Sequence, residues 1–127
     1  MGNNIITTCT VIEWVDKMQE SLNRHPRKYR PTFPLLEELS NASANLNSAV
    51  LSQPHCIAVQ IMVIHFLLTI RVSFKAVVGH SSGEVAAAYA TGFFSATDVI
   101  SIAYLRGTVT SQVSSTNQQS GVMMADG

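Results

Sequence analysis

The sequence predicts an α/β domain of three layers, in which a mostly parallel sheet lies between helices. Helical and strand-like segments alternate along the chain, as they do when helices connect parallel strands. A short apolar run, 74–78, also leads into the turn Gly79-His80-Ser81-Ser82-Gly83 and then into an alanine-rich helix. In a parallel sheet, such a turn lies at the carboxyl end of a central strand.

The first half of the chain is expected to be built around one amphipathic helix. Trp14, Val15, Met18 and Leu22 lie at helical spacing, and Pro26 requires the helix to end before it. The expected order is a segment with strand propensity (1–11), the amphipathic helix (13–23), a solvated basic loop (25–30), a linker (30–34), a short helix (35–39) and a polar loop (41–48).

The second half is expected to hold the core helix and the turn. Pro54 is compatible with the first turn of a buried helix that runs to about Ile70. Ser95 and Asp98 have the spacing of a capping box, with Asp in place of Glu. The expected order is the core helix (54–70), a buried strand (74–78), a helix (84–91) with Gly92 as its C′ cap, a helix from the capping box through Arg106 to about 112, a mobile connector (111–120) and the start of a strand (122–125) that has no partner in this chain.

The turn has the pattern of a nucleophile elbow, which makes Ser81 the candidate nucleophile. A serine at this position adopts strained backbone angles, and Gly79 and Gly83 lack the Cβ atoms that would clash there. The amide of Ser82 would then lie beside the oxygen of an attacked carbonyl, at the positive end of the following helix. The pentapeptide alone would also fit an ordinary turn, and its strand and helix context favours the elbow.

Two other polar residues of the turn region have simpler interpretations. His80 adjoins the nucleophile, but neighbouring residues of an elbow project in different directions, so we expect a packing or hydrogen-bonding role rather than that of the base. Glu84 falls in the first turn of the helix, where the helix dipole favours a carboxylate. Neither residue is therefore assigned a chemical role.

The wording of these segments resembles one family of enzymes. Gly79-His80-Ser81-Ser82-Gly83-Glu84 followed by Ala86-Ala87-Ala88-Tyr89-Ala90 is similar to the active-site segment of the acyltransferase domains of polyketide synthases and of malonyl-CoA:acyl carrier protein transacylases. The wording is nearest to that of fungal iterative polyketide synthases. Further similarity is found in the Gln-Pro helix (51–60), the arginine-bearing helix (103–107), the stretch before the small subdomain (121–125) and, more weakly, through 35–39 back to about Ile12.

The resemblance implies a function for two residues. Ser81 would take an acyl group from coenzyme A as an ester and pass it to the phosphopantetheine thiol of an acyl carrier protein. Arg106 would hold the free carboxylate of a malonyl-type extender unit, because a planar guanidinium meets a carboxylate with two parallel hydrogen bonds. The implied partners are the carrier protein and the other domains of a multidomain synthase, and no bound cofactor is implied.

The chain also departs from the family pattern, and these departures predict an incomplete domain. Residues 1–11 lack the Gly-Gln-Gly-type segment that supplies the second oxyanion contact and a central strand. The family's histidine base lies far downstream of the serine, whereas His25, His55 and His65 all precede Ser81. We therefore expect an atypical N-terminal segment (1–11), a partial large subdomain of the acyltransferase type (12–110), and a linker with the start of the small, ferredoxin-like subdomain (111–127).

Composition agrees with part of a larger domain. The 127 residues are 46% hydrophobic and 13% charged, so we expect exposed apolar faces and poor solubility. The formal net charge of zero gives no electrostatic reason for binding nucleic acid or an anionic membrane. Cys9 and Cys56 form no disulfide framework, Cys56 is expected to pack inside its helix, and no secretory signal is evident, so a cytoplasmic location is expected.

Metal binding and membrane insertion find no support in the sequence pattern. His55 and Cys56 are adjacent and do not converge as ligands one helical turn apart would. Polar residues interrupt the apolar stretch 56–74, so no run approaches the roughly 18 residues of a membrane span.

Three function classes remain open after this reasoning. The first is acyl transfer in polyketide or fatty acid biosynthesis, and the second is an ordinary serine hydrolase, which shares the elbow but has no use for Arg106. The third is a catalytically incomplete remnant or interaction module. The absence of the expected base and first strand favours the third class for this polypeptide in isolation.

Overall fold

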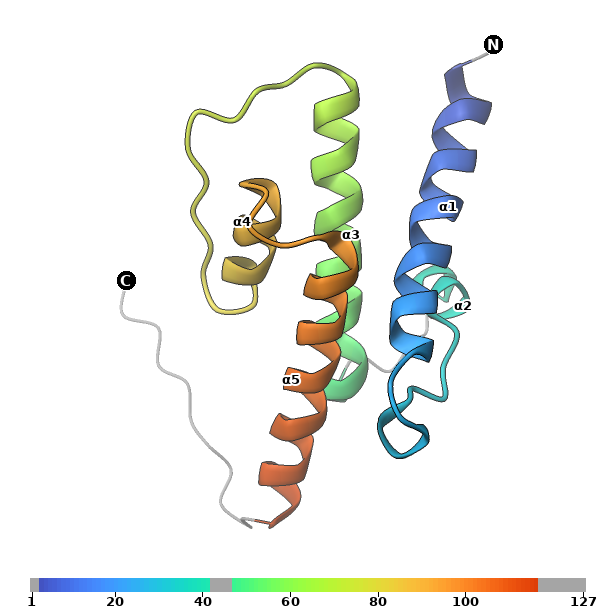
Figure 1. Ribbon diagram of the computed structural model, residues 1–127, viewed down its shortest axis with the longest axis vertical. Helices are drawn as coiled ribbons and strands as arrows, with labels where there is room; N and C mark the ends of the chain where they lie inside the picture. Colours follow the sequence, from blue (N-terminus) through green and yellow to red (C-terminus); the bar gives the residue numbers. More distant parts are fainter. Residues whose placement is uncertain (1–2, 42–46, 117–127) are drawn as a thin grey trace.

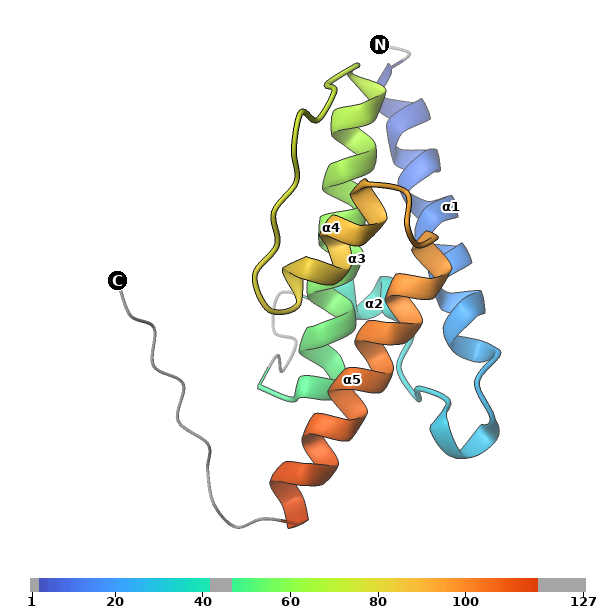
Figure 2. The same cartoon turned by 60° about the vertical axis from the view of Figure 1, so that its left-hand side comes forward.

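The computed structural model describes residues 3–41 and 47–116, and in these ranges all regular structure is helical. The elements are α1 (Asn3–Asn23), the 3-10 turn η1 (Arg27–Tyr29), α2 (Leu35–Ser40), α3 (Ala49–Thr69), α4 (Gly83–Ala90) and α5 (Ala96–Thr116). Helix α3 lies between α1 and α4, and α5 packs along it (Figure 1). Figure 2 shows the short helix α4 in front of α3.

The core lies where α3 and α5 meet α1. Apolar side chains on one face of each helix are buried, as helical amphipathicity requires. The fully buried side chains are Val15, Met18 and Leu22 from α1, Leu35 from α2, Pro54, Ile57, Ala58 and Ile61 from α3, and Val99 and Ile100 from α5. The predictions of an amphipathic helix ending before Pro26 and of a short helix at 35–39 are confirmed.

The caps of α4 and α5 match the sequence prediction. The amide of Ser95 donates to the Asp98 carboxylate at 3.1 Å, and the amide of Asp98 donates to the Ser95 hydroxyl at 3.2 Å, which makes a reciprocal capping box. After α4, Gly92 has a φ of 79°. Its amide donates to the Tyr89 carbonyl, and the amide of Phe93 donates to the Ala88 carbonyl. This pair of bonds is a Schellman motif.

Several expected boundaries were wrong. Helix α1 begins at Asn3, where strand propensity had been expected, because a helix satisfies its own backbone while a strand needs a paired neighbour. Helix α3 begins at Ala49, so Pro54 lies in its interior rather than in its first turn. Helix α5 continues to Thr116, beyond the expected end near 112 and into the segment expected to be a mobile connector. The expected strand at 122–125 lies outside the described residues.

The predicted strand at 74–78 is an unpaired extended segment. Backbone amides and carbonyls of 73–79 make no hydrogen bond within the described part of the chain, and Val78 is 96% exposed. Figure 1 shows this segment running outside α3 and α4. A strand forms only against a neighbour that completes its hydrogen bonds, and the described ranges supply none. The three-layer sheet is therefore not confirmed.

Helix α3 is more exposed than a core helix was expected to be. Val59, Val63 and Phe66 are 44%, 50% and 52% exposed, and Cys56, expected to pack inside, is also exposed. By length and composition alone, Ala49–Thr69 is apolar enough to cross a membrane, and only 22% of the relevant window is buried. Polar residues do interrupt this stretch, as expected, and the expectation that the domain has no membrane partner stays a prediction. A helix from the core of a larger protein passes the same test of length and hydropathy.

Candidate active site

The turn that carries Ser81 has the strained backbone that the sequence predicts. Ser81 has a φ of 55°, in the left-handed region that non-glycine residues rarely adopt. Immediately after it, the amide of Gly83 donates to the His80 carbonyl and that of Glu84 donates to the Ser81 carbonyl, so the turn closes directly into α4. The side chain of Ser81 is exposed at the start of this helix.

The two glycines of the turn have different environments. A Cβ on Gly79 would lie 2.3 Å from the Gly83 carbonyl oxygen and 2.4 Å from the Glu84 amide nitrogen. The expected role of Gly79, removal of a clashing Cβ, therefore agrees with the geometry of the turn. A Cβ on Gly83 would meet no atom of the described chain within 4 Å. The same expectation was wrong for Gly83.

Helix α5 brings Arg106 to Ser81. The Nη2 atom of Arg106 donates to the Ser81 Oγ at 3.4 Å, across 25 positions of sequence. Gly107, next to this arginine, is buried, and a Cβ there would lie 2.3 Å from the Ala49 carbonyl oxygen. This close approach of α5 to the start of α3 fixes the position from which Arg106 extends. The serine and the arginine singled out in the sequence therefore lie together.

The other residues of the turn surround the serine without contacting its hydroxyl. Ser82 is the N-cap of α4, and its amide donates no hydrogen bond to any described residue. Glu84 lies in the first turn of α4, as expected. The His80 ring is exposed, and it makes no hydrogen bond to the described chain, so a hydrogen-bonding role is not seen. Arg106 is the only described side chain that is hydrogen-bonded to the Ser81 hydroxyl.

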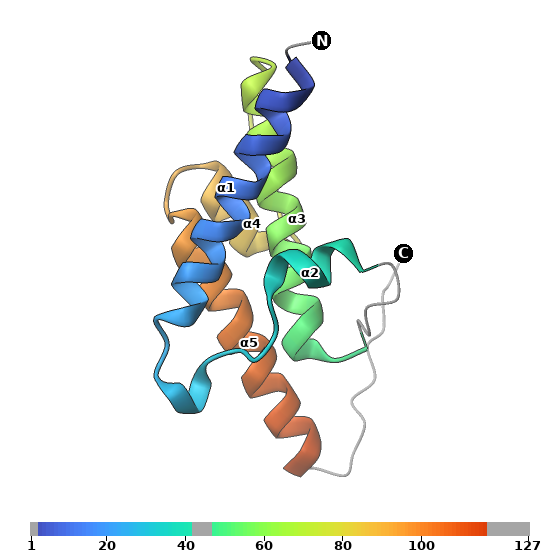
Figure 3. The ribbon, with the colours of Figure 1, turned by 90° about the vertical axis from the view of Figure 1, so that its right-hand side faces the viewer.

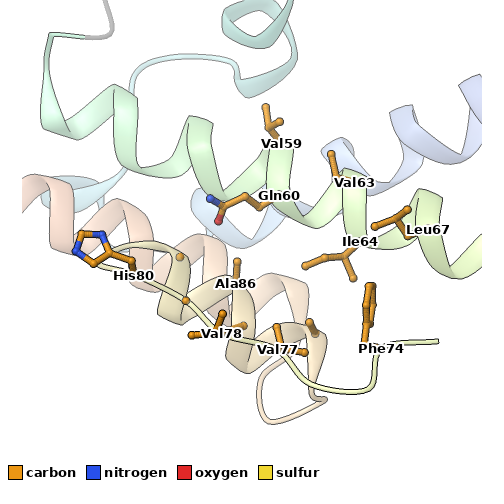
Figure 4. A pocket seen from close by; sticks show the side chains of 14 residues that line it. Val59, Gln60, Val63, Ile64, Leu67, Phe74, Val77, Val78, His80 and Ala86 are labelled. Atoms are coloured by element: carbon orange, nitrogen blue, oxygen red, sulfur yellow. The ribbon is translucent and has the colours of Figure 1, made fainter. Parts of the chain in front are cut away.

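An apolar groove of about 470 Å³ runs beside the turn. Its walls are α3, the extended segment before Ser81 and the inner face of α4. Figure 4 shows Leu67 and Phe74 at one end and His80 at the other, with Val63, Ile64 and Val77 between them. The lining is mostly apolar, with Gln60 and His80 as its polar side chains, so the groove offers packing surface and few polar partners.

The sequence reasoning missed a contact that joins three helices at the end of α4 opposite to Ser81. The Tyr89 hydroxyl of α4 is hydrogen-bonded to Nε2 of His65 on α3. The ring of Trp14 on α1 stacks on the same imidazole, with centroids 4.0 Å apart and an angle of 30° between the planes. We call Trp14, His65 and Tyr89 the aromatic bridge. The sequence gives no sign that His65 packs against Trp14, because the two residues lie on different helices and are far apart along the chain.

Burial sets the charge state of the aromatic bridge. Desolvation, and secondarily the positive charge of Lys17, hold the pKa of the His65 imidazole below 6.5. Desolvation raises the pKa of the Tyr89 hydroxyl above 10.0. The phenol therefore stays protonated near neutral pH and can donate a hydrogen bond. The neutral imidazole has a nitrogen lone pair that accepts this bond.

The remaining described histidines serve local packing. Nε2 of His55 lies 3.0 Å from the Glu38 carbonyl oxygen, and the ring of His25 lies 6.0 Å from that of Tyr104. Within 3–41 and 47–116, no three His, Cys, Asp or Glu side chains gather as metal ligands would.

Comparison with known proteins identifies the family. The model of the acyl transferase domain family matches residues 11–126, nearly the whole chain. The chain belongs to this family. No solved structure matches it.

The relatives of this acyltransferase domain are fungal polyketide synthases. The chain is 51% identical over 130 residues to the non-reducing polyketide synthase olcA of Penicillium canescens and 45% identical over 130 residues to the highly reducing polyketide synthase verA of Penicillium polonicum. Both alignments cover 100% of this chain. The polyketide synthase component of compactin nonaketide synthase from Penicillium citrinum is 45% identical over 116 residues, which cover 89% of the chain. The chain spans only about 5% of the length of the first two relatives.

Proposed function

We propose that the domain takes a malonyl-type acyl group from coenzyme A onto Ser81 and passes it to the phosphopantetheine thiol of an acyl carrier protein, as a step of polyketide biosynthesis. The observation that carries the proposal is the contact between Ser81 Oγ and the Arg106 guanidinium at 3.4 Å. The nucleophile and a cation that can bind a carboxylate thus lie close enough for one small substrate to contact both. A serine hydrolase acting on neutral esters has no use for this pairing.

The chemistry of a malonyl thioester matches the spacing of the two side chains. In the malonyl group, one methylene separates the thioester carbonyl from the free carboxylate. A substrate attacked by Ser81 therefore presents its carboxylate close to the nucleophile, where Arg106 extends. A guanidinium in this place orients the acyl group through two parallel hydrogen bonds and selects for a dicarboxylic unit over a plain acyl group.

The transfer proceeds in two steps, in which the coenzyme A thioester is exchanged for a serine ester and the serine ester is then exchanged for a thioester of the carrier protein. The Ser81 oxygen forms a bond to the thioester carbonyl carbon, the carbon–sulfur bond breaks, and coenzyme A leaves as its thiol with the serine proton. The carrier thiol then attacks the serine ester and regenerates the hydroxyl. The free amide of Ser82 at the N-terminus of α4 supports its role as a donor to the developing oxyanion.

A base must accept the serine proton, and Arg106 does not serve, since a guanidinium stays protonated. The family resemblance implies a histidine elsewhere in the polypeptide, so we propose that the rest of a polyketide synthase supplies it. The same larger protein would supply the strands that pair with 74–78, and it would also supply the side chains that fill the groove. The domain division at 11 and 110, the cytoplasmic location and the absence of nucleic acid or membrane partners stay predictions.

Loading from malonyl-CoA tests the proposal directly. After incubation of the purified chain with malonyl-CoA, intact-mass analysis should show slow addition of one malonyl group, because the base is not among the described residues, and Ser81→Ala should abolish it. Ser82→Ala is the matched control, because the proposed donor is the backbone amide and survives this substitution. A modified Ser81→Ala protein would contradict the assignment of the nucleophile, and so would the absence of loading at Ser81 in a longer synthase polypeptide that also contains the histidine base.

The role of Arg106 is tested by comparing two acyl groups. Arg106→Gln should lower the rate of malonyl loading by about 10-fold to 100-fold, the value of a charged hydrogen-bonded pair. Loading from acetyl-CoA, which has no free carboxylate, should change little. Equal losses for both acyl groups would mean that Arg106 serves the structure of the site rather than the carboxylate.

A further inference from the structure

Helix α4 directly follows the nucleophile, and it packs on the core through Val85, Ala86 and Tyr89. It is eight residues long, and Ala86, Ala87, Ala88 and Ala90 make up half of it. Alanine faces allow close packing, but they define neither the rotation nor the axial position of a helix as larger interlocking side chains do. Among the described residues, Tyr89 is the one side chain of α4 that is hydrogen-bonded to another helix.

The aromatic bridge provides a directional contact at the end of α4 opposite to Ser81. His65 lies near the C-terminus of α3, so the Tyr89 hydroxyl connects the C-terminal parts of α4 and α3. Trp14 of α1 stacks on the same imidazole, which restricts the orientation of the ring. Figure 3, seen from the side of α1, shows α1 in front of α3, and Figure 1 shows α3 between α1 and α4. The contact therefore extends from the outer helix through α3 to the helix of the nucleophile.

We propose that His65 and Tyr89 are positioning residues, which hold α4 in the register that keeps Ser81 beside Arg106. The inference deepens the proposed function, and its activity readout rests on that function. Arg106 is fixed by α5 through the close approach of Gly107 to Ala49, whereas Ser81 is fixed by α4. Without the hydrogen bond, α4 can slide or rotate on its alanine face while Arg106 stays in place. A displacement of about 1 Å costs up to 100-fold in rate when reacting groups must align.

The test uses hydroxyl deletion at Tyr89 with a matched control. Tyr89→Phe keeps the ring and removes the hydrogen bond. Tyr104→Phe makes the same change at a buried tyrosine of α5 whose hydroxyl has no hydrogen-bonded partner in the described chain. Amide hydrogen exchange in α4 should become about fivefold faster in Tyr89→Phe, the effect of one typical net hydrogen bond, and stay unchanged in Tyr104→Phe.

Variants of His65 distinguish positioning from general packing. His65→Phe removes the acceptor, and its combination with Tyr89→Phe should add nothing to either single effect, since both remove the same bond. His65→Gln retains an acceptor oxygen and should restore slow exchange. Loading of Ser81 should fall about tenfold at saturating malonyl-CoA in Tyr89→Phe and in His65→Phe, and recover in His65→Gln.

Each result decides the proposal. Equal exchange in Tyr89→Phe and Tyr104→Phe would overturn it, and so would additive effects of the two Phe variants. Faster exchange without slower loading would also overturn it, because α4 would then be held without positioning the serine. If no protein becomes loaded, wild type and a longer synthase polypeptide with the histidine base included, the proposed function fails, and the exchange data alone still decide whether the aromatic bridge holds α4.

Discussion

The substitution Gly107→Ala has two opposing effects on the free energy of unfolding. It disturbs the close packing of two helices, and it replaces glycine by alanine, which a helix prefers. The added Cβ would lie 2.3 Å from the Ala49 carbonyl oxygen, 2.9 Å from its carbon and 3.1 Å from the Val50 Cα. All three are backbone atoms, so no side chain can rotate away. Because ordinary contact begins at 3.4 Å, α5 has to move by about an ångström from the start of α3.

The magnitude follows from two opposing terms. Overpacking of this kind costs about 1–3 kcal/mol, and replacing glycine by alanine within a helix returns about 1 kcal/mol. We therefore expect a net loss of about 1 kcal/mol in the free energy of unfolding, measured by urea denaturation. Malonyl loading should fall as well, since Arg106 moves with its neighbour.

Gly83→Ala is the matched control for this measurement. It makes the same chemical change at the first position of α4, where a Cβ would meet nothing in the described chain within 4 Å. We expect stability that is unchanged or higher by about 0.5 kcal/mol. The difference between the two variants should therefore be about 1–1.5 kcal/mol, and it reports the close contact. If Gly107→Ala were as stable as Gly83→Ala, the close approach of α5 and α3 would be refuted.

Three further predictions concern the cap, the buried imidazole and the extended segment. Ser95→Ala should lower the free energy of unfolding by about 1 kcal/mol. The bonds from Ser95 also hold the pKa of Asp98 below 3.8, so this contribution should be present above that pH and be lost as the pH falls through the lower, folded-state pKa; a Ser95→Ala protein with unchanged acid unfolding would contradict it. His65 has a lowered pKa, so urea stability should be constant above about pH 6.5 and decrease below it, because the unfolded chain binds the proton more tightly; His65→Gln should lose this dependence, and a parallel decrease in both proteins would exclude His65 as its source. Val78 is 96% exposed, so Val78→Lys should raise the soluble yield of this chain and change its free energy of unfolding by no more than about 0.5 kcal/mol. The same change should lower the soluble yield of a longer synthase polypeptide if 74–78 pairs there as a strand. Tolerance in both polypeptides would argue against the sheet.

Local patterns of a few residues were read correctly from the sequence. The capping box at Ser95 and Asp98, the C′ glycine at 92 and the strained turn at Ser81 each depend on atoms that lie within a few positions of one another. Their geometry is set by backbone sterics and short-range hydrogen bonds, which the same residues reproduce in any fold. The predicted nucleophile follows from this kind of local evidence.

Patterns that need a distant partner were read less well. The apolar run 74–78 has strand propensity, but a strand exists only with a hydrogen-bonded neighbour, and the described chain provides none. Pro54 was assigned to the first turn of its helix because proline is favoured there, yet α3 begins at Ala49 and buries the proline among its neighbours. In both cases the tertiary surroundings outweighed the local preference.

By itself, the sequence determined the elbow, the family resemblance and the identity of Ser81 and Arg106 as candidates, because each is encoded in contiguous residues. Only the tertiary structure decided that the Arg106 guanidinium reaches the Ser81 hydroxyl, that Gly79 requires its missing Cβ while Gly83 does not, and that Tyr89 is joined to His65. These are distances between atoms on different helices. They are fixed by how α3, α4 and α5 pack, and packing depends on all the side chains of an interface together rather than on any one segment.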